Sequence, residues 1–348
     1  MNDLLTRCKT YLFCLITVAS LTACQGLFSK INDNISDNNK TECATDTTAV
    51  SFKKVAYWNG DNSDEIDNLY YASLTHLIYG YLQFKSDGSL VAFSDSEIND
   101  FEDMITYAQG QNVKILISIG GDSGSSANFK TIASSSSLTK TWVNNIIDFI
   151  EDYDLNGVDL NWQYPKDKSE GDLFEDLVSA LSSKLQDKGY LLSIAVISGV
   201  GDDENYADLI DSTVFDDVNF VNVRAFNTSN SDNLQSSKQD AIDSIDYWTE
   251  RCLIKNKLVL GIPLFADNGE SFDQIVNESR SYACTDNSKS RDYNGIPTVV
   301  DKTEYAMKYA GGMMMQSLDQ DAYREYPTYS LLDAIKETVD GNIVTICD

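Results

Sequence analysis

The sequence is poor in histidine, proline and basic residues. Its 348 residues include one histidine, four prolines and seven cysteines, and no two cysteines form a Cys-x-x-Cys pair. Because a structural zinc needs several closely spaced His or Cys ligands, we expect no metal centre. Lys and Arg together number 26 against 54 Asp and Glu, which gives a formal net charge of −28. A surface of this sign repels nucleic acid and anionic lipid headgroups, so we expect neither as a partner.

Long apolar runs and phosphate-binding loops are also missing. The apolar run at residues 11–18 is shorter than the roughly 20 residues that a bilayer-spanning helix needs, which argues against a transmembrane segment. The stretch GGDSG at residues 120–124 lacks the lysine and the spacing of a nucleotide site, so we expect no cofactor.

The first 24 residues have the features of an export signal. Arg7 and Lys9 precede the apolar run, and the segment ends in LTAC, with Cys24 last. This ending resembles the bacterial lipobox, in which a peptidase cuts ahead of the cysteine and the cysteine carries the lipid. An ordinary signal peptide with a chance cysteine is the alternative. We therefore expect a signal peptide at residues 1–23 and a protein anchored by its lipid in the bacterial cell envelope, at the outer membrane or cell surface.

The next segment is rich in Asn, Asp, Ser and Thr. Residues 24–50 show little apolar periodicity, which predicts a flexible lipidated tether. The folded domain is expected over residues 51–348, as a monomer.

Short β-type runs alternate with longer segments of helical period in this domain. Helical spacing places Val143, Ile146, Ile147 and Ile150 on one stripe, and a second stripe joins the leucines at 173, 177, 181 and 185. The expected strands are residues 53–59, 74–84, 113–121, 157–162, 190–197, 218–226, 257–265 and 311–318. Eight strands with helices between them favour an α/β fold of the (β/α)8 TIM-barrel type, whose ligands bind at the carboxyl ends of the strands. A doubly wound open sheet is the competing topology.

Four cysteines of the exported protein are available for pairing. Cys43, Cys252, Cys284 and Cys347 allow three connectivities, and free thiols are the alternative. Because a barrel brings its two ends together, we predict Cys43 with Cys347 and Cys252 with Cys284.

The segment NGVDLNWQYP at residues 156–165 resembles the strand-four motif of glycoside hydrolase family 18, the chitinase family, which is Asp-Gly-x-Asp-x-Asp-x-Glu followed by Tyr-Pro. SIGG at residues 118–121 is similar to the family's Ser-x-Gly-Gly at the end of strand three. GIP at 261–263 and GGMMM at 311–315 resemble its strands seven and eight. The resemblance covers about residues 53–335. It also indicates that no sizeable insertion domain follows strand seven, since residues 266–292 leave room for a helix and a loop only.

The resemblance assigns roles to three positions of the strand-four motif. In the family the final Glu protonates the glycosidic oxygen while the N-acetyl group of the substrate attacks the anomeric carbon, and the middle Asp stabilises that group. Gln163 stands at the acid position, Asn161 at the middle position, and Asp159 keeps the family residue. Side chains two apart on a strand point to the same side, so all three are expected to face the barrel interior. Gln163 has no titratable proton near neutral pH, which removes acid catalysis worth about 10²- to 10⁴-fold.

Strands six and eight depart from the family pattern as well. The family's Met-x-Tyr-Asp is replaced by Arg224-Ala225-Phe226-Asn227, without the tyrosine hydroxyl at Phe226 or the carboxylate at Asn227. Gln316 stands where the family has a tryptophan. We expect Arg224 to form a salt bridge with Asp159 in preference to meeting an anionic sugar.

Aromatic residues near the ends of the expected strands are candidates for sugar contact. Tyr57, Trp58, Trp162 and Tyr164 offer ring faces and hydroxyls, with core packing as the alternative. Tyr81 is expected in the core.

These departures predict a chitinase-like surface lipoprotein that binds N-acetylhexosamine glycans without hydrolysing them. One alternative is an active glycosidase of chitinase or endo-N-acetylglucosaminidase type, with an altered mechanism that takes its acid from residues 202–204. A protein-binding scaffold is the second alternative.

Overall fold

The computed structural model describes residues 43, 51–60, 70–226 and 235–347 of the chain. The predicted signal peptide, the lipidation site Cys24, the tether apart from Cys43, and the predicted glycan contact Asn227 lie outside the described residues. The description below concerns the larger of two compact units, Thr45–Asp348.

Eight strands form the centre of this unit, and each coincides with a predicted one. They are β1 (Lys53–Trp58), β2 (His76–Leu82), β3 (Lys114–Gly120), β4 (Gly157–Asn161), β5 (Leu191–Ile197), β6 (Phe220–Arg224), β7 (Leu258–Pro263) and β10 (Gly312–Gln316).

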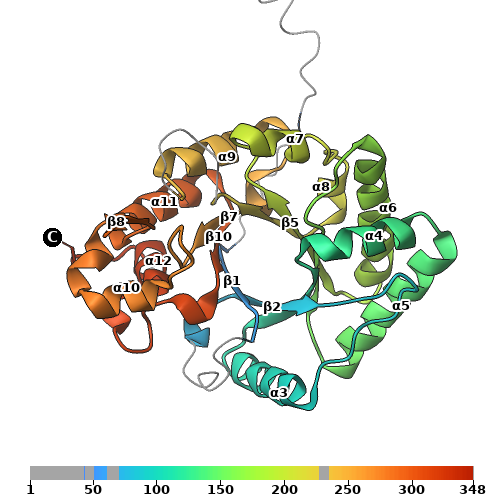
Figure 1. Cartoon of the computed structure of the whole chain (residues 1–348), viewed down its shortest axis with the longest axis horizontal. Coiled ribbons are helices and arrows are strands. Elements are labelled where there is room, and N and C mark those ends of the chain that lie inside the picture. The colour runs from blue at the N-terminus through green and yellow to red at the C-terminus, as the bar shows by residue number, and fades with distance from the viewer. Residues whose placement is uncertain (1–42, 44–50, 61–69, 227–234, 348) are drawn as a thin grey trace, which may run out of the picture. The chain divides into compact units, whose positions relative to one another are not determined.

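The strands close into a parallel barrel. Figure 1 shows the ring. The order of the strands is β1-β10-β7-β6-β5-β4-β3-β2, and the first strand pairs with β10, with Lys53 opposite Gly312. This closure confirms the (β/α)8 barrel and excludes the doubly wound open sheet.

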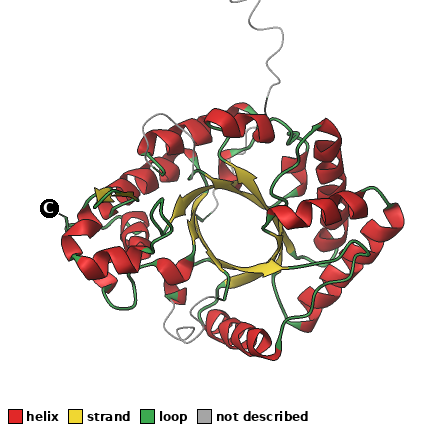
Figure 2. Cartoon of the chain, in the orientation of Figure 1, coloured by secondary structure: helices red, strands yellow, loops and turns green. Residues whose placement is uncertain are grey.

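Helices surround the ring of strands (Figure 2). In the described part of the chain, no helix is long and apolar enough to cross a membrane. The α-helices are α3 (Asp95–Gly110), α4 (Ser126–Ala133), α5 (Ser136–Asp152), α6 (Lys168–Gln186), α7 (Glu204–Ala207), α8 (Val214–Asp217), α9 (Lys238–Glu250), α10 (Phe272–Glu278), α11 (Ile296–Tyr309) and α12 (Leu331–Val339).

Two apolar layers follow from the alternation of side chains along each strand. A small inner cluster fills the barrel, with Val55, Leu116 and Met314 among its members. A much larger outer cluster lies between the sheet and the helices, and it buries the predicted stripe of α5 completely. On α6, residues 177, 181 and 185 are buried as predicted, while Leu173 at the start of the stripe is half-buried.

The segment after β7 contains more structure than the predicted helix and loop. Besides α10 it holds the 3-10 helix η7 (Arg280–Cys284) and a two-stranded antiparallel ladder, β8 (Asn287–Ser288) with β9 (Arg291–Asp292). Each strand of this ladder has two residues, so the segment remains far smaller than a domain.

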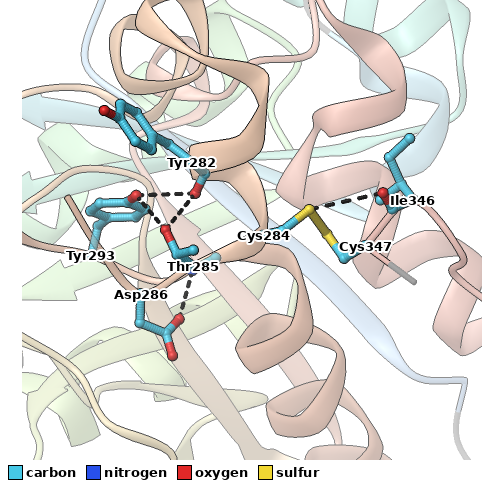
Figure 3. Close-up of a disulfide and its surroundings, with 8 residues drawn as sticks. Tyr282, Cys284, Thr285, Asp286, Tyr293, Ile346 and Cys347 are labelled. Carbon is cyan, nitrogen blue, oxygen red and sulfur yellow. Dashed lines mark hydrogen bonds between the residues drawn. A yellow bond between two sulfur atoms is a disulfide. The ribbon is translucent and has the colours of Figure 1, made fainter.

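The predicted disulfide pairing is wrong. Cys284 at the end of η7 bonds to Cys347, with their Cα atoms 5.4 Å apart (Figure 3). The prediction assumed that Cys347 would meet the start of the barrel, but the chain after α12 runs instead to the segment that follows β7. There the Tyr293 hydroxyl donates to the Tyr282 carbonyl at 3.0 Å, beside Cys284. Cys43 and Cys252 are also disulfide-bonded.

Candidate functional site

Asp159 is the centre of a polar cluster inside the barrel. The register of the sheet places Ser118 of β3 and Ser193 of β5 on either side of it, so all three side chains point the same way. One oxygen, Oδ2, accepts hydrogen bonds from Tyr57 Oη and Ser118 Oγ, both at 2.8 Å. The other, Oδ1, accepts from Ser193 Oγ at 2.7 Å and from Asn222 Nδ2 at 3.3 Å. Four neutral donors therefore occupy a carboxylate that is fully buried.

Burial dominates the ionisation of this cluster. It raises the pKa of Asp159 above the ordinary value, although each of the four donors favours the charged form and opposes the shift. Burial, followed by the neighbouring carboxylate, raises the pKa of Tyr57 well above the usual range, so this hydroxyl stays protonated and remains a donor. The cluster thus has a fixed pattern of donors and one acceptor group.

Asn161 and Gln163 continue the inward row toward the carboxyl ends of the strands, called here the barrel mouth. The Gln163 Nε2 group donates to Asn161 Oδ1 at 3.1 Å, and Ser126 Oγ donates to the Gln163 carbonyl at 3.3 Å. Asn161 is buried, whereas Gln163 is half-buried. Neither side chain can titrate, so this part of the site offers amide donors and acceptors and no acid.

Arg224 lies at the end of β6 and does not form the predicted salt bridge with Asp159. Its Nη1 donates instead to Tyr164 Oη at 3.0 Å, and its guanidinium carbon lies 5.3 Å from the centre of the Phe226 ring. The prediction failed because the neutral donors already fill both oxygens of Asp159. The predicted contacts Tyr164 and Phe226 are therefore brought together around Arg224.

Tyr81 and Gln316 form a second pair at the mouth. Gln316 Nε2 donates to Tyr81 Oη at 3.2 Å, and both side chains are half-buried. The expectation that Tyr81 belongs to the core is therefore wrong. Its ring lies against the backbone of Gly121, where a Cβ atom would stand 2.1 Å from the ring and where φ is +78°. The second glycine of SIGG thus leaves the space that the tyrosine occupies.

Two predicted glycan contacts belong to the outer layer instead. Trp58 and Trp162 are each 1% exposed and lie in the cluster between sheet and helices. The Trp162 ring stacks on Phe129 with a centroid distance of 5.1 Å. Because inward and outward positions alternate, Trp162 must point away from the side that Asn161 and Gln163 line. The prediction that these tryptophans contact the glycan is wrong.

Asp203 is the acidic side chain of residues 202–204 that faces the site. It is half-buried and accepts a hydrogen bond from Ser198 Oγ at 2.6 Å. Burial raises its pKa, and the charge of Arg224 acts in the opposite direction. Among the described residues no carboxylate hydrogen-bonds to Gln163.

Three residues of the site were not predicted from the sequence. Ser193 and Asn222 flank Asp159, and Tyr206 of α7 places its ring 6.0 Å from that of Tyr164. Counting inward positions along β5 and β6 would have found the first two, but nothing in the sequence marks Tyr206. Within the described part of the chain, no group of three or more His, Cys, Asp or Glu side chains is arranged to hold a metal ion.

Known proteins resemble this chain over most of the barrel. The family model described as Glycosyl hydrolases family 18 matches residues 53–326. Chitinase 1 of Aphanocladium album is 26% identical over 255 residues, which covers 61% of this chain and 58% of that protein. Human Chitinase-3-like protein 2 is 25% identical over 229 residues, covering 57% of this chain and 56% of that protein. The match thus spans less than two thirds of the length of either relative.

Solved structures share the fold. A GH18 chitinase, ChiB, from the chitin utilization locus of Flavobacterium johnsoniae superposes with a TM-score of 0.72 at 25% identity, covering 84% of this chain and 94% of that one. A mutant GH18 chitinase from Cycas revoluta, solved in complex with (GlcNAc)4, gives a TM-score of 0.71 at 23% identity, covering 82% and 99%.

Proposed function

Because this chain belongs to glycosyl hydrolase family 18, we propose that it binds an N-acetylhexosamine glycan at the barrel mouth and does not hydrolyse it. The observation that carries the proposal is the amide pair at the catalytic positions. Gln163 donates to Asn161, and neither can deliver a proton to a glycosidic oxygen or supply negative charge to a developing cation. This protein is then a chitinase-like binding protein.

The groups that remain at the mouth suit a sugar. The Asn161 amide can form a hydrogen bond with the acetamido group of the sugar. Tyr164 and Tyr81 are half-buried and carry hydroxyls, and Gln316 adds a further amide. Such a set of aromatic bodies with polar tips can contact both the C–H faces and the hydroxyls of a carbohydrate. The (GlcNAc)4 bound by the Cycas revoluta chitinase supports the choice of ligand class.

Two measurements test this proposal. Isothermal titration calorimetry with (GlcNAc)4 should give binding that Tyr164→Ala weakens. A reducing-end assay on chitin oligosaccharides should give the same background for the wild type and for Gln163→Ala. Release well above that control would overturn the non-catalytic assignment. Absence of any bound glycan, on calorimetry and on a glycan array, would favour the protein-binding scaffold.

One observation favours a second candidate, an altered glycosidase. Asp203 is half-buried near Arg224 and Tyr164, and burial raises its pKa, as a general acid requires. If Asp203 serves as the acid, a hydrolysis rate measurable in the wild type should disappear in Asp203→Asn and persist in Asp202→Asn.

We also propose that the protein is exported and lipid-anchored through Cys24 in the bacterial cell envelope. The Cys284–Cys347 disulfide supports export, because such bonds persist in oxidising compartments. Metabolic labelling with a radioactive fatty acid should mark the wild type and leave Cys24→Ala unlabelled. Equal labelling of the two would contradict the anchor.

A further inference from the structure

Arg224 carries a positive charge that the described part of the chain leaves without a carboxylate partner. Its one hydrogen bond there goes to a neutral hydroxyl, that of Tyr164, at 3.0 Å. Its Nε is buried and has no acceptor. A half-buried cation in this state is poorly compensated by the described residues, since burial removes water and none of their carboxylates forms an ion pair with it.

The surrounding acids do not remove this charge. Asp159 is saturated by its own four donors, and the neighbouring positions Asn161 and Gln163 are amides. Asp203 is near enough for the two charges to influence each other, but its short hydrogen bond goes to Ser198 and it forms no ion pair with Arg224. The chain has a formal net charge of −28, which disfavours anions in general, and Arg224 gives the mouth a positive charge that can attract one.

Aromatic side chains lie close to Arg224 at the barrel mouth. The guanidinium carbon of Arg224 lies 5.3 Å from the centre of the Phe226 ring. The Tyr164 ring lies 6.0 Å from that of Tyr206, which is 42% exposed. A sugar ring placed on the exposed tyrosine would bring its substituents toward Arg224, and a planar guanidinium is the side chain best suited to a carboxylate.

We propose that Arg224 binds a carboxylate of the glycan, so that the preferred ligand is an N-acetylhexosamine chain containing acidic sugars and not neutral chitin. This inference rests on the proposed glycan binding. The carboxylate can belong to a uronic acid or to a lactyl ether on the hexosamine, and both present the same planar anion.

Calorimetry with matched tetrasaccharides tests the proposal. The probes are neutral (GlcNAc)4, a tetrasaccharide alternating N-acetylglucosamine with glucuronic acid, and one alternating N-acetylglucosamine with N-acetylmuramic acid. Each acidic probe is also prepared as its methyl ester. At low salt at least one acid should bind about tenfold more tightly than its own ester, and this gain should shrink as salt screens the charges. The acid that shows the gain identifies the source of the carboxylate.

Three variants distinguish the effect of the Arg224 charge on affinity from an effect on folding. Arg224→Met, which introduces the residue of the family pattern, should abolish the difference in affinity between each acid and its own ester, and this difference is independent of any change in (GlcNAc)4 affinity caused by the loss of the hydrogen bond to Tyr164. Arg224→Lys should keep part of the difference, because the charge remains without the planar fork. Asp203→Asn should increase the affinity for the acid by removing a nearby negative charge. Unchanged circular dichroism and melting temperature control for folding.

The outcomes are distinct. If (GlcNAc)4 binds but both acids bind no better than their esters, the role of Arg224 is wrong and the proposed glycan binding stands. If a preference for an acid persists in Arg224→Met, another cation holds the carboxylate and the assignment is wrong. If no probe binds, the proposed function fails and this inference fails with it.

Discussion

Gln163 and Asn161 form a hydrogen bond of 3.1 Å between Nε2 and Oδ1, at the two positions where the family pattern has Glu and Asp. Two ionised carboxylates at this separation would repel each other, and one of them would have its pKa raised. The amide pair replaces that repulsion with a donor and an acceptor of almost the same size. These two positions therefore hold no ionisable group, and their side chains form a contact at the end of β4 instead.

Restoring both carboxylates should reveal this repulsion. We expect the double variant Asn161→Asp/Gln163→Glu to lose more free energy of unfolding than the two single variants lose together, by about 1–2 kcal/mol at pH 8. The raised pKa belongs to the folded state, so the coupling energy should be absent at low pH, where both groups are protonated, and should appear as the pH rises. Urea unfolding of the four proteins at pH 4 and pH 8 measures it. Additive effects at pH 8 would show that the two side chains do not interact.

Replacing Asp159 by Asn tests the buried cluster. The amide nitrogen would face hydroxyl donors, so we expect a loss of about 2–3 kcal/mol in the free energy of unfolding. Exposed Asp148 provides the control, since Asp148→Asn should change stability by less than about 0.5 kcal/mol.

The pH dependence of that loss has a definite sign. Burial raises the pKa of Asp159 in the folded state, so the folded protein binds this proton more tightly than the unfolded chain does. The stabilising contribution of Asp159 is then complete below the unfolded pKa of about 3.9 and decreases as the pH rises through the folded pKa. The difference between the wild type and Asp159→Asn should be largest at low pH. A difference that grows with pH would mean that the four donors outweigh burial.

Gly121 should be essential for the position of Tyr81. In Gly121→Ala the new Cβ would lie 2.1 Å from the tyrosine ring, at a φ of +78°. Gly189 is a matched control, because its φ is +77° and nothing lies within 4 Å of the added atom. We expect Gly189→Ala to lose about 1 kcal/mol from backbone strain alone, and Gly121→Ala to lose about 2–4 kcal/mol and to bind (GlcNAc)4 more weakly. Equal losses measured by urea unfolding would indicate that the ring moves freely.

The eight strands could be predicted from the sequence because each is a short apolar run, and two of the helices because each has an apolar stripe. The closure of the strands into a barrel followed from the family resemblance, since the alternation of elements also fits an open sheet. The inward row of Asp159, Asn161 and Gln163 followed from the period of a strand. The same period shows that Trp162, which lies between Asn161 and Gln163 in the sequence, points out of the barrel.

Other features depend on contacts between distant segments. The bond from Gln316 to Tyr81 joins residues 235 positions apart, and no local pattern encodes it. The partner of Arg224 was predicted wrongly, because the choice between Asp159 and Tyr164 depends on which donors already surround the carboxylate.

The Cys284–Cys347 disulfide should contribute strongly to stability, because it closes a loop with a sequence separation of 63 residues. Chain-entropy arguments give about 4 kcal/mol for a loop of this length. We expect the double variant Cys284→Ala/Cys347→Ala to lose this amount in urea unfolding under oxidising conditions. Reductant should destabilise the variant further, because Cys43 and Cys252 are also disulfide-bonded. A loss below about 1 kcal/mol in the double variant would show that contacts of the C-terminal segment, and not the covalent link, hold it against η7.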